Sequence, residues 1–306
     1  SGLYWLLSIA VCVTAFVLAY IFSFHSQLGE VREVSSQRLE FYAVNLESSL
    51  EKYDFLLVLT LYQDVTLLLL QPRDAELQRK LNVYLQSLQE QSRAAAIYVL
   101  DAKGKTLAAS NWREPGSFIG HNYAFRPYYQ AAISGRQGQF YGIGTTTGEP
   151  GYFLSSPVYK NNRLIGVVVV KVSLAETEEV WRRSGEKVVV ADANGIIFLS
   201  SVSRWRYRTL APVPEHTLAS LHEARQYGDH SLNPIAPLAI APPSAGQRMA
   251  IELPERGLGG SGVYNMRELL VMSRPTGRLG WQLLLFTDMD STRQLARNLG
   301  ASVAFT

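Results

Sequence analysis

The chain opens with an uncharged apolar segment, and this segment decides in which surroundings the rest can fold. Leu3 to Phe24 is a run of 22 residues without a charged side chain. A helix of roughly 20 apolar residues spans the hydrocarbon layer of a bilayer, so we predict a transmembrane helix over residues 3–24. A cleaved signal peptide is the alternative. The segment has no basic stretch after Ser1 and no small-x-small site before His25, which favours an anchor that is retained.

Length and charge limit what lies beyond this anchor. A chain of 306 residues with 47% apolar content can bury two cores, and we expect two modules. A net charge of +3 is too small for a surface that binds nucleic acid. The only cysteine, Cys12, lies in the apolar run, so no disulfide or cysteine metal site is expected in the water-soluble part.

The region after the anchor has a helical pattern over residues 25–92. Apolar residues recur at helical spacing at Val31, Val34, Leu39, Tyr42, Leu46, Leu50 and Tyr53. Pro72 marks a break, and a second helix is predicted from Asp74 to about Ser92. Two interpretations of the long helix stay open: an amphipathic helix packed on its own modules, or one that also provides a dimer seam.

Short strands and turns begin after Ala94. We predict a hairpin from residues 97–100 and 106–110, a short helix over 127–133, and strands near 138–143, 151–159 and 163–172. An antiparallel sheet with helices is an α+β module, predicted here over residues 93–180.

The hairpin motif occurs a second time. Tyr98-Val-Leu-Asp-Ala-Lys-Gly104 aligns with Val189-Val-Ala-Asp-Ala-Asn-Gly195, and Leu154-Ser-Ser-Pro157 aligns with Met272-Ser-Arg-Pro275. A second module of the same kind is therefore predicted over residues 181–290. Its last strand has apolar residues where the first module has Lys171, so one charged pocket, and one ligand per chain, is expected.

Two cations of the first module indicate an anion pocket. Lys171 shares a strand face with Val167 and Val169, because side chains alternate along a strand. Arg126 precedes Pro127 at a predicted helix start, where free N–H groups also attract anions. A lysine at a sheet edge and a surface arginine are the plain alternatives. Five cations against one acid, Glu149, between residues 115 and 172 favour the pocket.

The C-terminal residues 291–306 become apolar again after Leu299 and are interpreted as the start of a second transmembrane segment. The glycine pattern Gly257-Leu-Gly-Gly-Ser-Gly262 lacks the strand and helix of a nucleotide site. The histidines have no metal-ligand spacing, and no catalytic site is expected in this segment.

These features together resemble the extracytoplasmic regions of the DctB family of C4-dicarboxylate sensor histidine kinases, which are double Cache, or tandem PAS-like, proteins. The resemblance rests on the anchor, the tandem modules and the runs Asn122 to Tyr129, Gly144 to Tyr152 and Trp205 to Leu210. It implies an α+β fold whose membrane-distal module binds succinate, fumarate or malate. The implied ligand contacts are Tyr123, Arg126, Thr145, Thr146, Thr147, Tyr152, Ser155 and Lys171.

The same resemblance implies a bacterial inner-membrane protein, with this region mainly in the periplasm, and a homodimer. For a kinase portion beyond this segment, the resemblance implies ATP as a cofactor and a response regulator as a partner. Three classes remain open: the input region of such a kinase, the ectodomain of a chemoreceptor or of a kinase that senses amino acids or another small anion, and an anchored solute-binding or hydrolytic domain. Both cations are expected to stay charged from about pH 6 to 8, because free lysine titrates near 10.4.

Overall fold

The structure is a computed structural model that describes the chain except for residues 1, 62–67, 70–73, 237–240, 255–263 and 305–306. It begins with one continuous helix, α1 (Gly2–Leu61), which is followed by α3 (Ala75–Ser92). The predicted break at Pro72 and the glycine pattern of residues 257–262 lie outside the described residues. The side chain of Asp74 accepts a hydrogen bond from Leu77 N and so caps the start of α3.

The first module, called the distal module below, contains one antiparallel sheet. Its elements are β1 (Ala96–Asp101), β2 (Thr106–Ala109), α4 (Pro127–Ile133), β3 (Gly138–Ile143), β4 (Pro150–Lys160) and β5 (Arg163–Val172). The strand order is β2-β1-β5-β4-β3. The turn between β4 and β5 consists of Asn161 and Asn162, which both have positive φ, as a tight hairpin requires.

The second module, called the proximal module, repeats this plan. Its elements are α5 (Ala175–Ser184), β6 (Lys187–Ala191), β7 (Ile197–Ser200), η1 (Ser203–Trp205), α6 (Glu215–Glu223), β8 (Gln247–Pro254), β9 (Tyr264–Pro275) and β10 (Gln282–Asp288). The order β7-β6-β10-β9-β8 matches that of the distal sheet, which is the order a duplicated module predicts. The expected α+β fold with two antiparallel sheets is confirmed.

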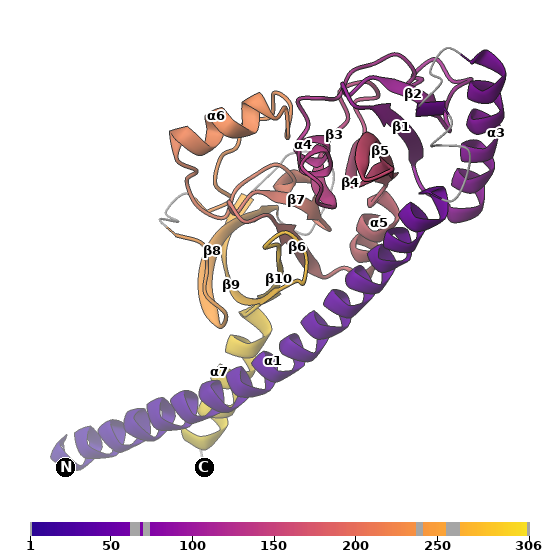
Figure 1. Cartoon of the computed structure of the whole chain (residues 1–306). Coiled ribbons are helices and arrows are strands. Elements are labelled where there is room, and N and C mark those ends of the chain that lie inside the picture. Colours follow the sequence, from indigo (N-terminus) through magenta and orange to yellow (C-terminus); the bar gives the residue numbers. More distant parts are fainter. Residues whose placement is uncertain (1, 62–67, 70–73, 237–240, 255–263, 305–306) are drawn as a thin grey trace.

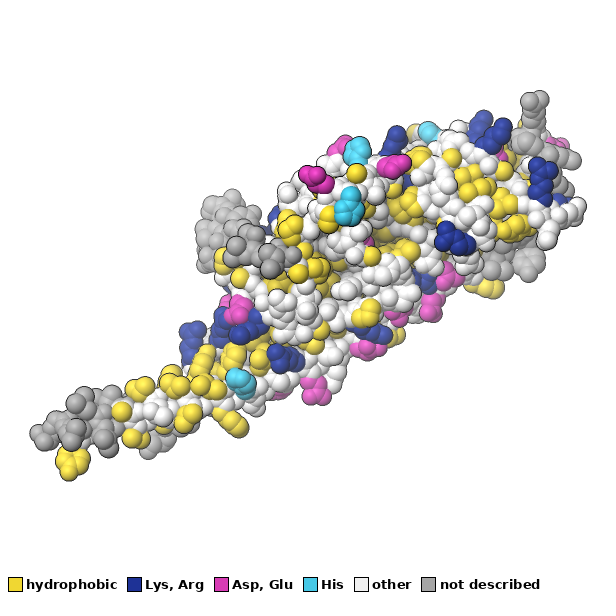
Figure 2. All heavy atoms as spheres, turned by 60° about the vertical axis from the view of Figure 1, so that its left-hand side comes forward, with side chains coloured by type: hydrophobic (Ala, Val, Ile, Leu, Met, Phe, Trp, Pro, Cys, Tyr) yellow, Lys and Arg dark blue, Asp and Glu magenta, His cyan; other side chains and the backbone are white. Residues whose placement is uncertain are grey.

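The chain ends in α7 (Asp290–Ala304), which lies beside α1 (Figure 1). The N-terminal part of α1 projects away from both modules. Its described surface is apolar, and charged side chains gather where the helix reaches the folded part (Figure 2). By length and composition, one helix among the described residues fits a membrane span.

Each face of the distal sheet packs against a different layer. One face lies against α1 and α3, where Leu46, Leu50 and Leu85 are buried with Val168 and Val170. The other face is covered by α4 and is lined by aromatic rings, which include Tyr98, Tyr128, Phe140 and Phe153. The alternation of β5 decides which of its side chains enters which layer.

The proximal module is fastened to α1 by three acidic residues spaced seven apart. Glu40 pairs with Arg274 at 2.7 Å, and Glu47 accepts a hydrogen bond from Gly277 N at 3.1 Å. Asp54 receives both terminal nitrogens of Arg278, at 2.7 and 3.3 Å. A spacing of seven keeps the acids on one side of the helix, so the β9–β10 hairpin and its loop lie along α1.

We predict that Arg278→Leu lowers the free energy of unfolding by about 1 to 3 kcal/mol, because it leaves Asp54 without its ion pair and the buried Tyr152 hydroxyl without its donor. The matched control is Arg183→Leu, since Arg183 is 79% exposed and solvent screens its pair with Glu179, so this variant should unfold like the unmodified chain. Urea unfolding of the detergent-solubilised chain measures both. Equal losses in the two variants would contradict the role assigned to Arg278.

Candidate anion-binding site

The two cations chosen from the sequence lie on the same face of the distal sheet. Arg126 is the N-cap residue of α4, and Pro127 follows at the first helical position. Lys171 lies on β5 and is directed to the α4 face together with Val167 and Val169. The side chains are only 1% and 3% exposed, so neither cation is the surface residue of the plain alternative.

Arg126 is bonded entirely to backbone carbonyl groups. Its Nη1 donates to Ala224 O and Arg225 O, both at 3.1 Å, and its Nη2 donates to Ile143 O at 2.5 Å. The rings of Phe125 and Phe140 lie 5.3 and 5.5 Å from the guanidinium carbon. Burial lowers the pKa of Arg126 from its usual value, although the group stays charged at neutral pH.

Lys171 reaches the loop between β3 and β4. Its Nζ donates to Thr147 Oγ1 at 3.2 Å and to Glu149 O at 3.0 Å, and the Phe153 ring lies 5.8 Å away. Burial lowers the pKa of Lys171 to about 8; the negative charge of Glu149 opposes this shift, and the positive charge of Arg126 adds to it. The expectation of an unchanging charge up to pH 8 is therefore wrong, because it used the pKa of an exposed lysine.

Neither cation forms an ion pair with a carboxylate in the part of the chain that the structure describes. The Glu149 side chain is exposed, and only its backbone oxygen binds Lys171. Buried charges are normally paired, because desolvation of an ion costs several kcal/mol. Two buried cations bonded only to carbonyl and hydroxyl oxygens therefore make a site of positive potential that suits an anion.

Most of the remaining residues chosen from the sequence surround this pair. The hydroxyl of Tyr123 lies 2.6 Å from Thr146 Oγ1, which ties the α4 approach to the loop. Thr147 accepts a hydrogen bond from Lys171, and both Thr145 and Thr147 are exposed. Ser155 lies on the correct face but is fully buried, and its hydroxyl donates to Tyr128 O at 2.7 Å. Ser155 therefore supports α4 in this structure.

Tyr152 does not face the site. It lies on the opposite side of β4, where its ring packs on Trp281 with centroids 5.2 Å apart and its hydroxyl accepts a hydrogen bond from Arg278 Nη1 at 3.2 Å. The choice of Tyr152 as a contact of the same pocket is corrected by this geometry. Alternation along β4 instead places its neighbour Phe153 beside Lys171.

The aromatic residues of the site were missed by sequence reasoning. Tyr98 and Tyr128 share a hydrogen bond of 2.8 Å between their hydroxyls, and the Tyr128 ring stacks on Phe153 at 5.1 Å. Burial raises the pKa of both tyrosines, so the hydroxyls stay protonated at neutral pH. Tyr98 alternates along β1 with Ala96 and Leu100 on the same face of the strand, and this alternation could have indicated its place in the site.

The glycines of the loop serve two purposes. A Cβ on Gly151 would lie 2.7 Å from Cε of Lys171, so this glycine leaves room for the lysine stem. Gly148 has open space around it but a φ of +70°, which a turn at this position requires.

The equivalent place in the proximal module is filled by apolar side chains. Strand registers pair Lys171 with Ala96 and Phe286 with Lys187, so Phe286 occupies the position of Lys171. Its ring packs edge-on against Trp205 at 5.0 Å within a buried apolar cluster. At this position the described part of the proximal module therefore has an apolar ring where the distal module has a cation.

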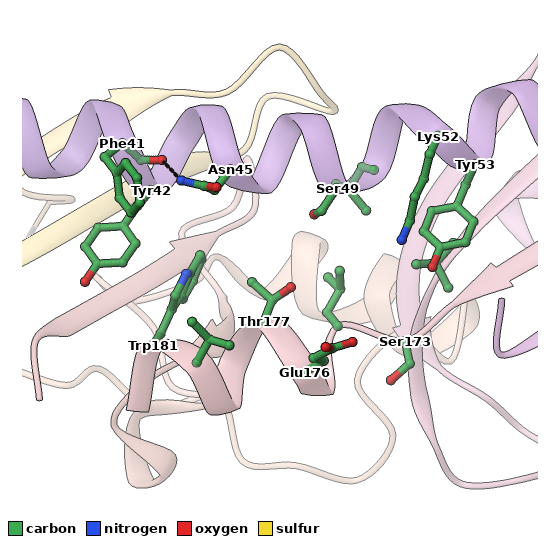
Figure 3. A pocket seen from close by; sticks show the side chains of 14 residues that line it. Phe41, Tyr42, Asn45, Ser49, Lys52, Tyr53, Ser173, Glu176, Thr177 and Trp181 are labelled. Carbon is green, nitrogen blue, oxygen red and sulfur yellow. Dashed lines mark hydrogen bonds between the residues drawn. The ribbon is translucent and has the colours of Figure 1, made fainter. Parts of the chain in front are cut away.

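A separate groove of about 370 Å³ lies between α1 and α5 (Figure 3). Tyr42 and Trp181 close one end, and Lys52 and Tyr53 extend from α1 at the other. It borders the end of β5 at Ser173 but does not include either buried cation.

Comparisons with known proteins show which family and fold the chain resembles. The Cache domain family matches residues 26–294. The C4-dicarboxylate transport sensor protein DctB of Pseudomonas aeruginosa is 37% identical over 194 residues, which cover 63% of this chain and 32% of that protein. The chain therefore spans about a third of that relative's length.

Solved structures show the same fold. The V. cholerae histidine kinase DctB sensor domain is 26% identical, with a TM-score of 0.74 over 86% of this chain and 98% of that one. The ligand-binding domain of the Pseudomonas fluorescens chemoreceptor CtaA in complex with L-alanine is 18% identical, with a TM-score of 0.56 over 85% and 98% of the two chains. The second likeness concerns the fold alone.

We predict that the Lys171 amine loses its proton with a midpoint near pH 8, because burial favours the neutral amine. Reductive ¹³C-methylation followed by NMR titration measures this midpoint, and Lys171→Arg identifies the signal. Arg126→Met should move the midpoint upward, since it removes a nearby positive charge. A midpoint near 10.5 in the unmodified chain would contradict the burial of this lysine.

Proposed function

The chain belongs to the Cache domain family, and from that premise we propose that its distal module binds a C4-dicarboxylate such as succinate, fumarate or malate. The observation that carries this proposal is the pair of buried cations, Arg126 and Lys171, which have no carboxylate partner among the described residues. The named function of the P. aeruginosa relative supports the choice of ligand.

The chemistry of the site suits a diacid. The planar fork of Arg126 binds one carboxylate through paired N–H groups, and the ammonium of Lys171 binds the other. The hydroxyls of Thr146 and Thr147 in the β3–β4 loop, and that of Tyr123 beside Thr146, can donate to the remaining oxygen lone pairs. The fixed positions of the two cations then select the length of the diacid.

We further propose that binding is signalled across a membrane by a histidine kinase portion outside this segment. That portion would use ATP and transfer phosphate to a response regulator, with the two modules in the periplasm of a bacterium. The apolar part of α1 supports the membrane span. β10 is followed directly by α7, which lies beside α1, so a change in the proximal sheet reaches the membrane end of the chain.

An amino-acid sensor on a chemoreceptor is the second candidate, because the CtaA domain with L-alanine has this fold. An amino acid carries an ammonium group, which requires an acidic or carbonyl partner in the pocket. In the part of the pocket that the structure describes, the buried charged groups are cations and the nearest acid, Glu149, is exposed. This charge balance favours the diacid.

We also propose that two chains associate along α1. Val34, Phe41, Val44 and Phe55 are exposed on the helix, the two phenylalanines by 66% and 63%. At 3.6 residues per turn they lie opposite the buried face formed by Leu39, Leu46 and Leu50. One apolar face of α1 packs on the modules of its own chain. The opposite apolar face is exposed and suits the α1 helix of a second copy.

For the ligand, we predict that calorimetry of the chain in nanodiscs gives one succinate per chain. Lys171→Met should cost about 2 to 5 kcal/mol, or roughly thirtyfold to several thousandfold in affinity, because a carboxylate loses its counter-charge. Arg126→Lys should cost at least about tenfold, since the fork is lost. Arg136→Met, at an exposed position, is the control that should bind like the unmodified chain.

Butyrate should bind at least about a hundredfold more weakly than succinate, because it leaves one buried cation unpaired. Similar affinities for butyrate and succinate, or two succinates bound per chain, would contradict the two-cation site.

For the dimer, we predict that Val44→Cys in a Cys12→Ser background forms a disulfide between chains in membranes under mild oxidation. Val83→Cys is the control, because Val83 is also exposed but lies on α3 away from the apolar stripe of α1. Non-reducing electrophoresis separates the products. Equal cross-linking at both positions, or none at Val44, would argue against association along α1.

A further inference from the structure

Residues 224–227 of the proximal module, called the strap below, run across the end of β3 in the distal module. Ile143 N donates to Gln226 O at 2.8 Å, and a Cβ on Gly142 would lie 3.0 Å from the same oxygen. Figure 1 shows α6, which leads into the strap, on the side of the molecule where α4 and β3 lie. The strap thus contacts the strand that leads into the β3–β4 loop.

The strap also holds the side chain of Arg126. Ala224 is the C-cap residue of α6, and its carbonyl and that of Arg225 both accept from Nη1 of Arg126. Carbonyl groups at a helix C-terminus carry partial negative charge, which favours a cation there. An arginine of the distal module therefore terminates a helix of the proximal module.

The strap is itself fixed in place. Tyr227 is buried, and its hydroxyl donates to Asp192 Oδ2 at 2.9 Å. Arg225 N bonds to His222 O and Gln226 N to Leu221 O, both at 2.9 Å, so the backbone turns back on α6. Asp192 also accepts from the amides of the β6–β7 turn, which connects the strap to the proximal sheet.

The hydrogen bonds to the strap do not use all the N–H donors of Arg126. A guanidinium has five N–H donors in a rigid fork. The hydrogen bonds of Arg126 in the described structure use both donors of Nη1 and one of Nη2. Nε has no hydrogen bond among the described residues, and Nε and Nη2 together form an edge of the kind that matches the two oxygens of a carboxylate.

We propose that the strap positions Arg126 for the ligand's carboxylate, so that the proximal module takes part in ligand binding through its backbone carbonyl groups. The inference rests on the proposed function, because it takes a dicarboxylate as the ligand. Coupling of this kind is reciprocal: whatever factor the strap adds to ligand affinity, the ligand adds to the stability of the strap contact.

The test uses two variants that each remove one tyrosine hydroxyl. Tyr227→Phe deletes the bond from the strap to Asp192, and Tyr42→Phe deletes a comparable bond of 3.1 Å between α1 and Ser184, away from the strap. Calorimetry with succinate on the whole chain in nanodiscs should show a loss of roughly threefold to tenfold for Tyr227→Phe, the effect of one hydrogen bond, and no loss for Tyr42→Phe.

Two further measurements separate positioning from a general loss of stability. In an Arg126→Lys background, Tyr227→Phe should cause no additional loss of succinate affinity, because there is no fork left to position. Hydrogen exchange of the Ile143 amide, which donates to the strap, should slow when succinate binds to the unmodified chain.

Additive losses, or unchanged affinity in Tyr227→Phe, would overturn the positioning role while leaving the pocket assignment intact. Failure of succinate to bind the unmodified chain would overturn the proposed function and this inference with it.

Discussion

The packing of both modules on α1 is the constraint on which the rest of the structure depends. The buried face of α1 covers the back of the distal sheet through Leu46 and Leu50, and its acidic residues hold the β9–β10 hairpin of the proximal module. The opposite face of the distal sheet is therefore covered by α4 and the β3–β4 loop. The charged site can lie on that face because the apolar core of the module is completed on the other.

The site combines two kinds of buried cation. Lys171 is held by a loop of its own module, and burial brings its pKa close to the physiological range. Arg126 is held by the neighbouring module and keeps its charge at any neutral pH. A site with these two groups is sensitive to pH through one cation and to the contact between modules through the other.

The sequence allowed much of the fold to be predicted, because the patterns that decide it are local. The period of β5 placed Lys171 correctly, and the repeat identified the apolar strand that contains Phe286. Tyr152 was assigned to the site by resemblance, although alternation along one strand separates it from Ser155. Two of the three carbonyl partners of Arg126, those of Ala224 and Arg225, are about a hundred residues away, and no local pattern predicts such contacts. The lowered pKa of Lys171 depends on burial by the folded loop and had no signal either.

The three acidic residues of α1 have a consequence for how the chain can move. Glu40, Glu47 and Asp54 repeat with the period at which a straight helix nearly superimposes on itself after two turns, an axial step of about 10 Å. A shorter slide of the β9–β10 hairpin along α1 would break all three contacts at once and offer no partial replacement. The three contacts therefore fix the position of the hairpin along the helix axis. These contacts favour a movement in which α1 and the hairpin tilt or turn together over one in which they slide past each other.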